Sequence, residues 1–243
     1  GKGGPSFERA LTEELIHCTL FGNQTQGGDR VKTGTGKTFR PIGPTTYLSP
    51  IPAVMLGCAD PENGYEANLI TVAWTGVVCT RPPMVSVSIR KSRLSHELIR
   101  RTGEFTLNLT GRSLCRAVDF CGVKSGRDVN KFEACGLTPI PAPPLTHAPA
   151  VAEAPAYLCC RVKSVQELGS HDLFLAEVEQ VYVADEYFTE SGSIREEDME
   201  LVAYVHGKYC AVGKPLGFFG YSVASPKALK RRSAPKGGGK RKG

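Results

Sequence analysis

Polar and cationic side chains gather in one short stretch, SIRKSRLSHELI at residues 88–99, which predicts a strand that turns into a helix. The start of a helix offers unpaired backbone N–H groups and the positive end of its dipole, and both attract anions. Ser95 stands where the N-cap of this helix is expected. Hydroxyl donors and positive charges precede it, namely Ser88, Arg90, Lys91, Ser92 and Arg93. The stretch therefore predicts a phosphate-binding turn, and a solvated basic turn before an ordinary helix is the alternative.

A second candidate for nucleotide chemistry, GTGKT at residues 34–38, fails on its spacing. A P-loop needs a glycine five positions before its Gly-Lys pair, and Val31 stands there instead. No buried strand is predicted before it either. We therefore do not expect a nucleoside triphosphatase.

Two single side chains could take part in catalysis. His171 lies in a polar turn, GSHD, just ahead of a predicted strand, which makes it the histidine with the clearest case for a function. A solvated turn histidine is the alternative. Cys79 could act as a thiol, but cysteine more commonly serves as a small buried hydrophobic residue, so no role is assigned to it.

The elements that would position these side chains are mostly short strands. Seven β-rich segments are bounded by turn residues, at 52–58, 68–74, 83–90, 104–109, 157–165, 172–183 and 201–210. The third alternates, with Val85, Val87 and Ile89 on one face. Many short strands with few helices predict a mainly β fold, an antiparallel barrel, over a doubly wound parallel sheet.

Helices and loops fill the remainder. Residues 95–102 predict a helix closed by Gly103, and residues 113–136 predict a helical stretch in which Gly122 and Gly136 suit helix stops. The proline-rich residues 137–156 predict a rigid connector within one domain.

The two ends of the chain differ from its middle. An amphipathic helix is expected within residues 5–21, followed by a loop or extended arm at 22–46. The predicted organisation is an N-terminal helix and arm at 1–44, a barrel domain at 45–225 and a tail at 226–243.

The net positive charge of the chain comes from that tail. The whole chain carries +6, but residues 226–243 hold eight Lys and Arg and no acid, which leaves 22 basic against 24 acidic residues. The body therefore carries a charge of −2, which argues against nucleic acid as its partner. The tail is predicted to be a solvated extension, and contact with a polyanion through it is the alternative.

Composition sets the class of protein and its compartment. The chain of 243 residues is 41% hydrophobic and 22% charged, as in a soluble globular protein, and no apolar run approaches the roughly 18 residues of a membrane span. Neither a membrane segment nor a signal peptide is expected. Nine cysteines without CxxC pairs predict free thiols, hence a reducing, cytoplasmic setting, and no zinc site.

An ordered series of blocks resembles one known family. They are ANLITVAW at 67–74, RPPMVSVSIR at 81–90, SHELIRRTGEFTLNL at 95–109, DFCG at 119–122, NKF at 130–132, GLTPI at 136–140 and GSHDLFLAEV at 169–178. Over about residues 45–222 the chain resembles the flavin reductase-like family, which includes flavoredoxins and related FMN proteins. Each block alone is weak, whereas the ordered set is specific.

The resemblance implies a split barrel of antiparallel strands in Greek-key order, a homodimer, and noncovalent FMN near the subunit interface. The implied FMN contacts are Asn68, Thr71, Val72, Ala73 and Trp74 around the isoalloxazine, Ser88, Arg90, Lys91, Ser92 and Ser95 around ribityl and phosphate, and Asn108 and Lys131 near the flavin. His171 matches a histidine near the nicotinamide or flavin. Trp74 could instead be a core residue.

Three functions follow from these observations. The first is an FMN-dependent oxidoreductase that passes electrons from NAD(P)H to a flavin, ferric or other acceptor. The second is an FMN-bearing electron carrier reduced by a protein partner. The third is a polyanion-binding protein that acts through its basic tail.

Overall fold

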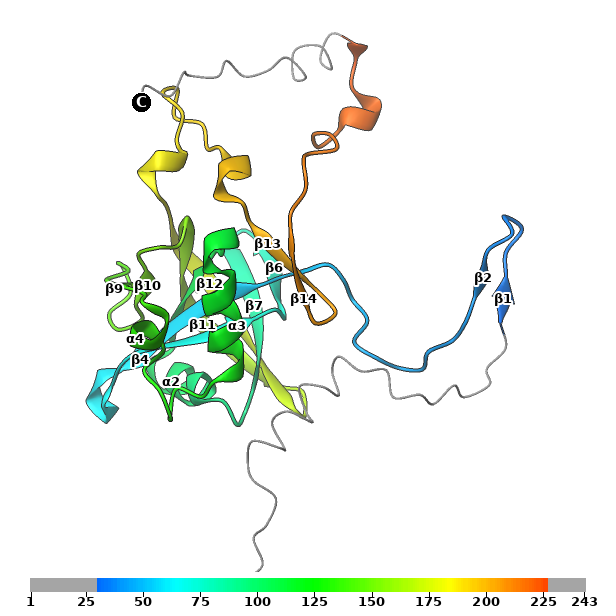
Figure 1. Ribbon diagram of the computed structural model, residues 1–243. Coiled ribbons are helices and arrows are strands. Elements are labelled where there is room, and N and C mark those ends of the chain that lie inside the picture. The colour runs from blue at the N-terminus through cyan, green and yellow to red at the C-terminus, as the bar shows by residue number, and fades with distance from the viewer. Residues whose placement is uncertain (1–29, 227–243) are drawn as a thin grey trace, which may run out of the picture. The chain divides into compact units, whose positions relative to one another are not determined.

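The computed structural model describes residues 30–226 of the chain. The predicted N-terminal helix and all but the first residue of the predicted tail lie outside these residues. Contacts divide the chain into a unit of residues 1–212 and a unit of residues 213–243. In the second unit, the described residues contain one short 3-10 helix, η5 (Tyr221–Val223). The fold below is that of the first unit (Figure 1).

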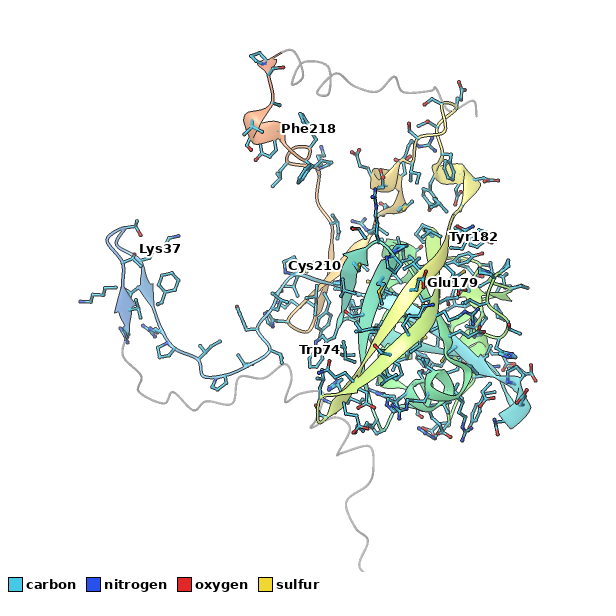
Figure 2. All side chains as sticks on the ribbon, turned by 180° about the vertical axis from the view of Figure 1, so that it is seen from behind. Lys37, Trp74, Glu179, Tyr182, Cys210 and Phe218 are labelled. Carbon is cyan, nitrogen blue, oxygen red and sulfur yellow. The ribbon has the colours of Figure 1, made fainter. Side chains whose placement is uncertain are left out.

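A seven-stranded antiparallel sheet forms the body of this unit. Its strands are β4 (Val54–Asp60), β5 (Tyr65–Val72), β6 (Thr75–Thr80), β7 (Pro83–Arg90), β8 (Glu104–Asn108), β11 (Ala156–Glu167) and β12 (His171–Val183). They pair in the order β5-β4-β8-β11-β12-β7-β6. The predicted mainly β, antiparallel architecture is thus confirmed, although β6 was not among the predicted strands. Figure 2 shows β12 crossing the molecule toward the end that carries Glu179 and Tyr182.

The two end strands of the sheet meet at Trp74. β5 and β6 occupy opposite ends of the strand order, yet only Ala73 and Trp74 separate them along the chain. The sheet must therefore curve until its two edges meet. The backbone N–H of Ser88 donates to the Trp74 carbonyl over 2.9 Å, which joins β7 to the corner between β5 and β6. The result is a barrel with its seam at Trp74.

The barrel interior is filled by the alternating side chains of its strands. Val85, Val87 and Ile89 of β7 are buried there, as their spacing predicts. They pack with large residues of other strands, chiefly Phe105 and Phe174, and with Leu98 of α2 (Leu94–Thr102). Gly103 ends α2 at φ 72°, as predicted, because this left-handed conformation favours glycine.

A second core lies outside the barrel, between β4, β5 and two helices. β4 is buried on both faces, and its Met55 packs with Val118 of α3 (Cys115–Val123) and Phe132 of α4 (Lys131–Cys135). α3 lies against β5 (Figure 1). The prediction that Gly122 stops a helix is wrong, because α3 continues through it to Val123. A Cβ at Gly122 would lie 3.4 Å from Thr71 Cβ, so the glycine serves the close approach of α3 to β5.

The proline-rich residues 137–156 are tied to the barrel by a buried carboxylate. This segment contains β9 (Pro139–Ile140) and β10 (Ala150–Val151), which pair with each other. Glu104 is 1% exposed and accepts the backbone N–H groups of Thr146, His147 and Ala148, together with the guanidinium of Arg161. Four donors compensate the burial of its charge and hold the connector in place.

A smaller three-stranded sheet and two short pieces complete the unit. β3 (Ile51–Pro52) pairs with β13 (Val202–Val205), which pairs with β14 (Lys208–Ala211). The predicted single strand at 201–210 is wrong, because His206 and Gly207, at φ 41° and 80°, turn it into a hairpin. Within the predicted arm, β1 (Val31–Lys32) and β2 (Thr38–Phe39) form another hairpin. The remaining turns are the 3-10 helices η1 (Pro61–Asn63), η2 (Arg112–Leu114), η3 (Asp185–Tyr187) and η4 (Glu196–Met199).

Within residues 30–226 no helix combines the length and the apolar character needed to cross a membrane.

Candidate functional site

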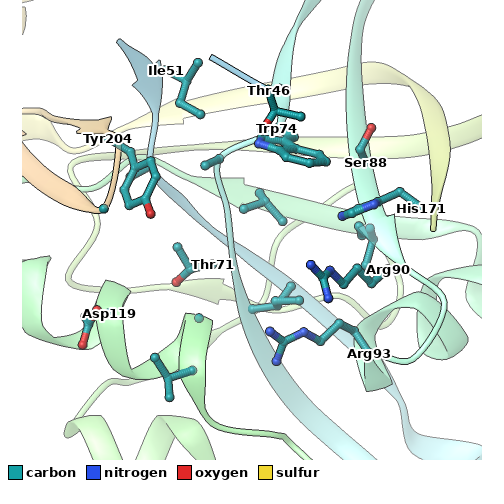
Figure 3. A pocket seen from close by; sticks show the side chains of 18 of the residues that line it. Thr46, Ile51, Thr71, Trp74, Ser88, Arg90, Arg93, Asp119, His171 and Tyr204 are labelled. Atoms are coloured by element: carbon teal, nitrogen blue, oxygen red, sulfur yellow. The ribbon is translucent and has the colours of Figure 1, made fainter. Parts of the chain in front are cut away.

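A cavity of about 430 Å³ opens beside the barrel seam (Figure 3). Its walls come from the end of β5, the end of β7, the start of β12, α3, the β13–β14 hairpin, and the chain around β3. Segments far apart in sequence therefore meet here because of the barrel closure. A cavity of this volume accommodates a cofactor or substrate of moderate size.

Seven of the predicted site residues line this cavity. They are Thr71, Val72, Ala73, Trp74, Ser88, Arg90 and His171. The structure thus brings the end of one predicted strand, the basic turn and the GSHD turn to one place. The six other predicted residues lie outside the lining and are described below.

Trp74 and His171 form one wall. Their ring centroids are 4.6 Å apart, with a tilt of 34° between the planes. Trp74 is 40% exposed, so it is not the core residue that an apolar strand suggested as the alternative. His171 begins β12, directly opposite Arg90 of β7.

The imidazole of His171 is held neutral near pH 7. Burial lowers its pKa below 6.5, and the positive charge of Arg90 lowers it further. Its Nδ1 lies 2.8 Å from Ser170 Oγ, in hydrogen-bond contact. A neutral imidazole can both donate and accept a hydrogen bond, which suits it to orient a ligand.

Arg90 and Arg93 make the adjoining wall cationic (Figure 3). Arg93 is the N-cap residue of α2, with an extended backbone, so Ser95 is not the N-cap and that prediction is wrong. The turn is braced by Arg127, which donates to the Ser92 carbonyl over 3.1 Å and to the Glu97 carboxylate over 3.0 Å. This wall joins two guanidinium groups with the start of a nine-residue helix, a combination that attracts anions.

Lys91 and Ser92 belong to the same turn but do not line the cavity. Lys91 Nζ lies 2.8 Å from the Glu167 carboxylate and 3.4 Å from that of Asp172. The hydrogen bond with Glu167 is the main reason that the pKa of Lys91 is raised. Lys91 therefore ties the turn to the β11–β12 hairpin.

Three predicted contacts are buried in the protein instead. Asn68 donates to Ser95 Oγ over 2.8 Å, which links β5 to α2. Asn108 is fully buried, donates to the Met55 carbonyl over 3.0 Å, and accepts the Val151 N–H over 2.8 Å. The side chains of Asn68, Ser95 and Asn108 thus serve structural hydrogen bonds, and a direct role toward a cofactor stays a prediction.

Lys131 is a buried cation that does not line the cavity. Its Nζ donates to the carbonyls of Leu69 and Cys121 over 2.7 and 2.9 Å. Burial lowers its pKa to about 8, against the opposing effect of the nearby Cys121 thiol. Because Leu69 belongs to β5 and Cys121 to α3, Lys131 joins the two elements that carry Thr71 and Asp119.

Several lining residues were not predicted. Asp119 and Gly122 come from α3, and Tyr204, His206 and Tyr209 come from the β13–β14 hairpin. Asp119 and Gly122 belong to the DFCG block at 119–122, which could have indicated them. No pattern within residues 201–210 indicates that the hairpin folds over the cavity.

The sequence comparisons point to one family. The model of the flavin reductase like domain matches residues 48–213. An uncharacterized protein of Pyrococcus abyssi is 32% identical over 116 residues, which cover 48% of this chain and 66% of that protein. The reductase component of a 4-nitrophenol 4-monooxygenase/4-nitrocatechol 2-monooxygenase of Rhodococcus opacus is 33% identical over 111 residues, which cover 44% of this chain and 54% of that protein. The matched part of the chain thus spans between half and two thirds of the length of these two relatives.

The structure comparison agrees. The flavoredoxin of Desulfovibrio vulgaris (Miyazaki F) is similar at 28% identity with a TM-score of 0.71, over 76% of this chain and all of that one. This likeness, together with an antiparallel sheet whose two end strands meet at Trp74, confirms the predicted split-barrel fold.

Proposed function

The chain belongs to the flavin reductase-like family, and on this premise we propose that it is an FMN-dependent oxidoreductase. It moves electrons from NAD(P)H through noncovalently bound FMN to a flavin, ferric or other acceptor. The observation that carries the proposal is the cavity at the barrel seam, where a cationic wall adjoins a wall of polar and aromatic side chains.

The cavity residues fit the two ends of FMN. Arg90, Arg93 and the start of α2 provide positive charge and N–H donors for a phosphate. Thr71 and Trp74 provide a wall against which a planar ring can pack. FMN, when bound, supplies the two-electron and one-electron chemistry, while the protein supplies position and electrostatics.

His171 acts on the second substrate in this proposal. Its neutral imidazole lies beside Trp74 and can hydrogen-bond a nicotinamide carboxamide without adding charge next to the flavin. Orientation of this kind lowers the entropy lost on reaching the reactive geometry.

The likeness to a flavoredoxin favours a second function, an electron carrier reduced by a protein partner. The two functions differ in one measurable property. An NAD(P)H oxidoreductase is reduced directly by nicotinamide, whereas the carrier is not.

We further propose a homodimer in a reducing compartment such as the cytoplasm. Val77 and Val78 of β6 are 77% and 52% exposed on the last strand of the sheet order, and a second copy would cover them. The eight cysteines of the described residues are all free thiols, which supports the proposed reducing compartment. Light scattering on the purified chain tests the dimer.

Flavin content and anaerobic reduction test the main proposal. The purified protein should be yellow, should release FMN on denaturation, and should bleach with NADH or NADPH in the absence of oxygen. A protein that takes up no FMN contradicts the proposal. A protein that binds FMN but is bleached by neither nucleotide supports the carrier instead.

Paired variants test the phosphate wall. Arg90→Gln with Arg93→Gln should raise the FMN dissociation constant at least about tenfold, because charge-assisted hydrogen bonds are lost. Arg116→Gln removes the same charge from an exposed position of α3 outside the cavity and should leave the constant unchanged. An FMN dissociation constant of the double variant equal to that of Arg116→Gln would contradict the assignment of this wall.

A further inference from the structure

The cavity has a second end of opposite character. Asp119 of α3 lies across it from Arg90 and Arg93, with Tyr204 of β13 on the same side as the aspartate (Figure 3). Tyr209 of β14 also lines the cavity and lies beside Tyr204 and Asp119. One end therefore carries two guanidinium groups, and the other carries a carboxylate and two phenol rings.

The aromatic side chains at the acidic end are held in fixed positions. Tyr204 and Tyr209 face each other across the β13–β14 hairpin, with ring centroids 5.5 Å apart in an edge-to-face arrangement. Both rings pack against the buried cluster that includes Leu114 and Val118. Because the hairpin rests on the core of α3, the tyrosines keep their places relative to Asp119.

The electrostatics of this end favour ligands that donate a hydrogen bond. Tyrosine is protonated at physiological pH even at its ordinary pKa, and here burial, followed by the charge of the Asp119 carboxylate, raises the pKa of Tyr209 further. The Tyr209 hydroxyl is hydrogen-bonded to Asp119, which leaves the other lone pairs of the carboxylate for a ligand. Asp119 itself is exposed to the cavity and accepts hydrogen bonds only, because an ionised carboxylate has no proton to donate. A second anion placed here would be repelled by it.

We propose that this end of the cavity, made by Asp119, Tyr204 and Tyr209, selects a ligand other than FMN and the nicotinamide. It binds a planar aromatic compound that offers an N–H or O–H donor to Asp119 and packs on the two phenol rings. It disfavours aromatic compounds without a donor. To call that ligand the electron acceptor rests on the proposed function, whereas the donor preference itself does not.

Two quinones of matched shape test the selection. 2-Amino-1,4-naphthoquinone carries an N–H donor where 2-methyl-1,4-naphthoquinone carries a methyl group of similar size. Their dissociation constants are measured by calorimetry on the full chain saturated with FMN, in the absence of reductant. The wild-type protein should bind the amino compound about tenfold more tightly, the contribution expected of one hydrogen bond to a charged acceptor.

Two variants then test whether Asp119 causes the preference for the amino quinone. Asp119→Asn should remove most of the tenfold difference while the methyl compound still binds, since the tyrosines remain. Glu133→Gln, an exposed carboxylate on α4 that does not line the cavity, makes the same change of charge and should keep the difference. Equal binding of both quinones by the wild-type protein, or an unchanged preference in Asp119→Asn, would overturn the inference.

The outcome can be separated from that of the proposed function. If the chain takes up no FMN, the proposed function fails, and the same titrations on the protein as purified still decide whether Asp119 sets a donor preference. If FMN binds and is reduced but Asp119→Asn behaves as wild type, only this inference fails.

Discussion

The rings of Trp74 and His171 lie 4.6 Å apart, although 97 positions separate the two residues in the chain. Trp74 is held at the corner between β5 and β6 by the hydrogen bond of its carbonyl to Ser88. His171 is held by its pairing with Arg90, two residues further along β7. The pair is therefore a product of barrel closure, and it places an aromatic reporter beside a titratable group.

Trp74 should report FMN binding by its fluorescence. It is the single tryptophan of the chain and lines the cavity, so a flavin bound there accepts its excitation energy. Titration with FMN should quench most of the emission. The dissociation constant from the quenching curve should equal the one that calorimetry gives. Emission that stays constant when calorimetry shows saturation would place the flavin away from this cavity.

His171→Gln should leave FMN bound and slow its reduction by NADH or NADPH. Loss of an orienting group can reduce a rate by about a hundredfold, whereas loss of a solvated bystander changes nothing. Anaerobic stopped-flow bleaching measures the effect. His147→Gln, in the proline-rich connector away from this cavity, is the control. A wild-type rate with both nucleotides in His171→Gln would remove the histidine from the reaction.

The pKa of His171 should respond to Arg90. In the wild-type protein the pKa lies below 6.5, chiefly through burial and in second place through the Arg90 charge. Arg90→Gln should therefore raise it, but not fully to 6.5. Because the folded pKa is lowered, His171 contributes stability above pH 6.5 that is lost as the pH falls through the folded pKa. Titration of the imidazole by NMR measures the shift, and an unchanged pKa would contradict the contact.

The barrel strands could be predicted because their side chains alternate and their ends carry turn residues. Val85, Val87 and Ile89 are buried on one face, as the period of two requires. β6 escaped prediction because its sequence, TGVVCT, follows the preceding strand after only two residues and exposes both valines. Its place is decided by pairing with β7 and not by burial of its own side chains.

The site could be predicted where the family blocks cover it and not where tertiary packing completes it. Arg90 and His171 belong to quoted blocks and line the cavity. Ser95 looked like a helix cap, but the helix begins at Leu94 with Arg93 as its N-cap, and the Ser95 hydroxyl accepts a hydrogen bond from Asn68. Tyr209 reaches the cavity only because a hairpin turn at His206 and Gly207 reverses a stretch that reads as one strand.

The buried Lys131 should make stability depend on pH above neutrality. Its folded pKa is about 8 and its ordinary value is 10.5, so the unfolded chain binds its proton more strongly than the folded protein does. The free energy of unfolding contributed by Lys131 is therefore lowest below pH 8 and rises as the pH increases toward 10.5. A difference of this size corresponds to about 3 kcal/mol.

Lys131→Met isolates this effect, because methionine fills similar space and carries no proton. Urea unfolding at several values between pH 8 and 10.5, with a reductant to protect the thiols, gives the free energy of unfolding of each protein. The wild-type protein should gain about 3 kcal/mol relative to Lys131→Met over this range, since the ammonium loses its charge and the cost of burying that charge disappears. Lys163→Met changes an exposed lysine of β11 and should run parallel to the wild type. If the curves of wild type and Lys131→Met also run parallel, burial does not lower the pKa of Lys131 in solution.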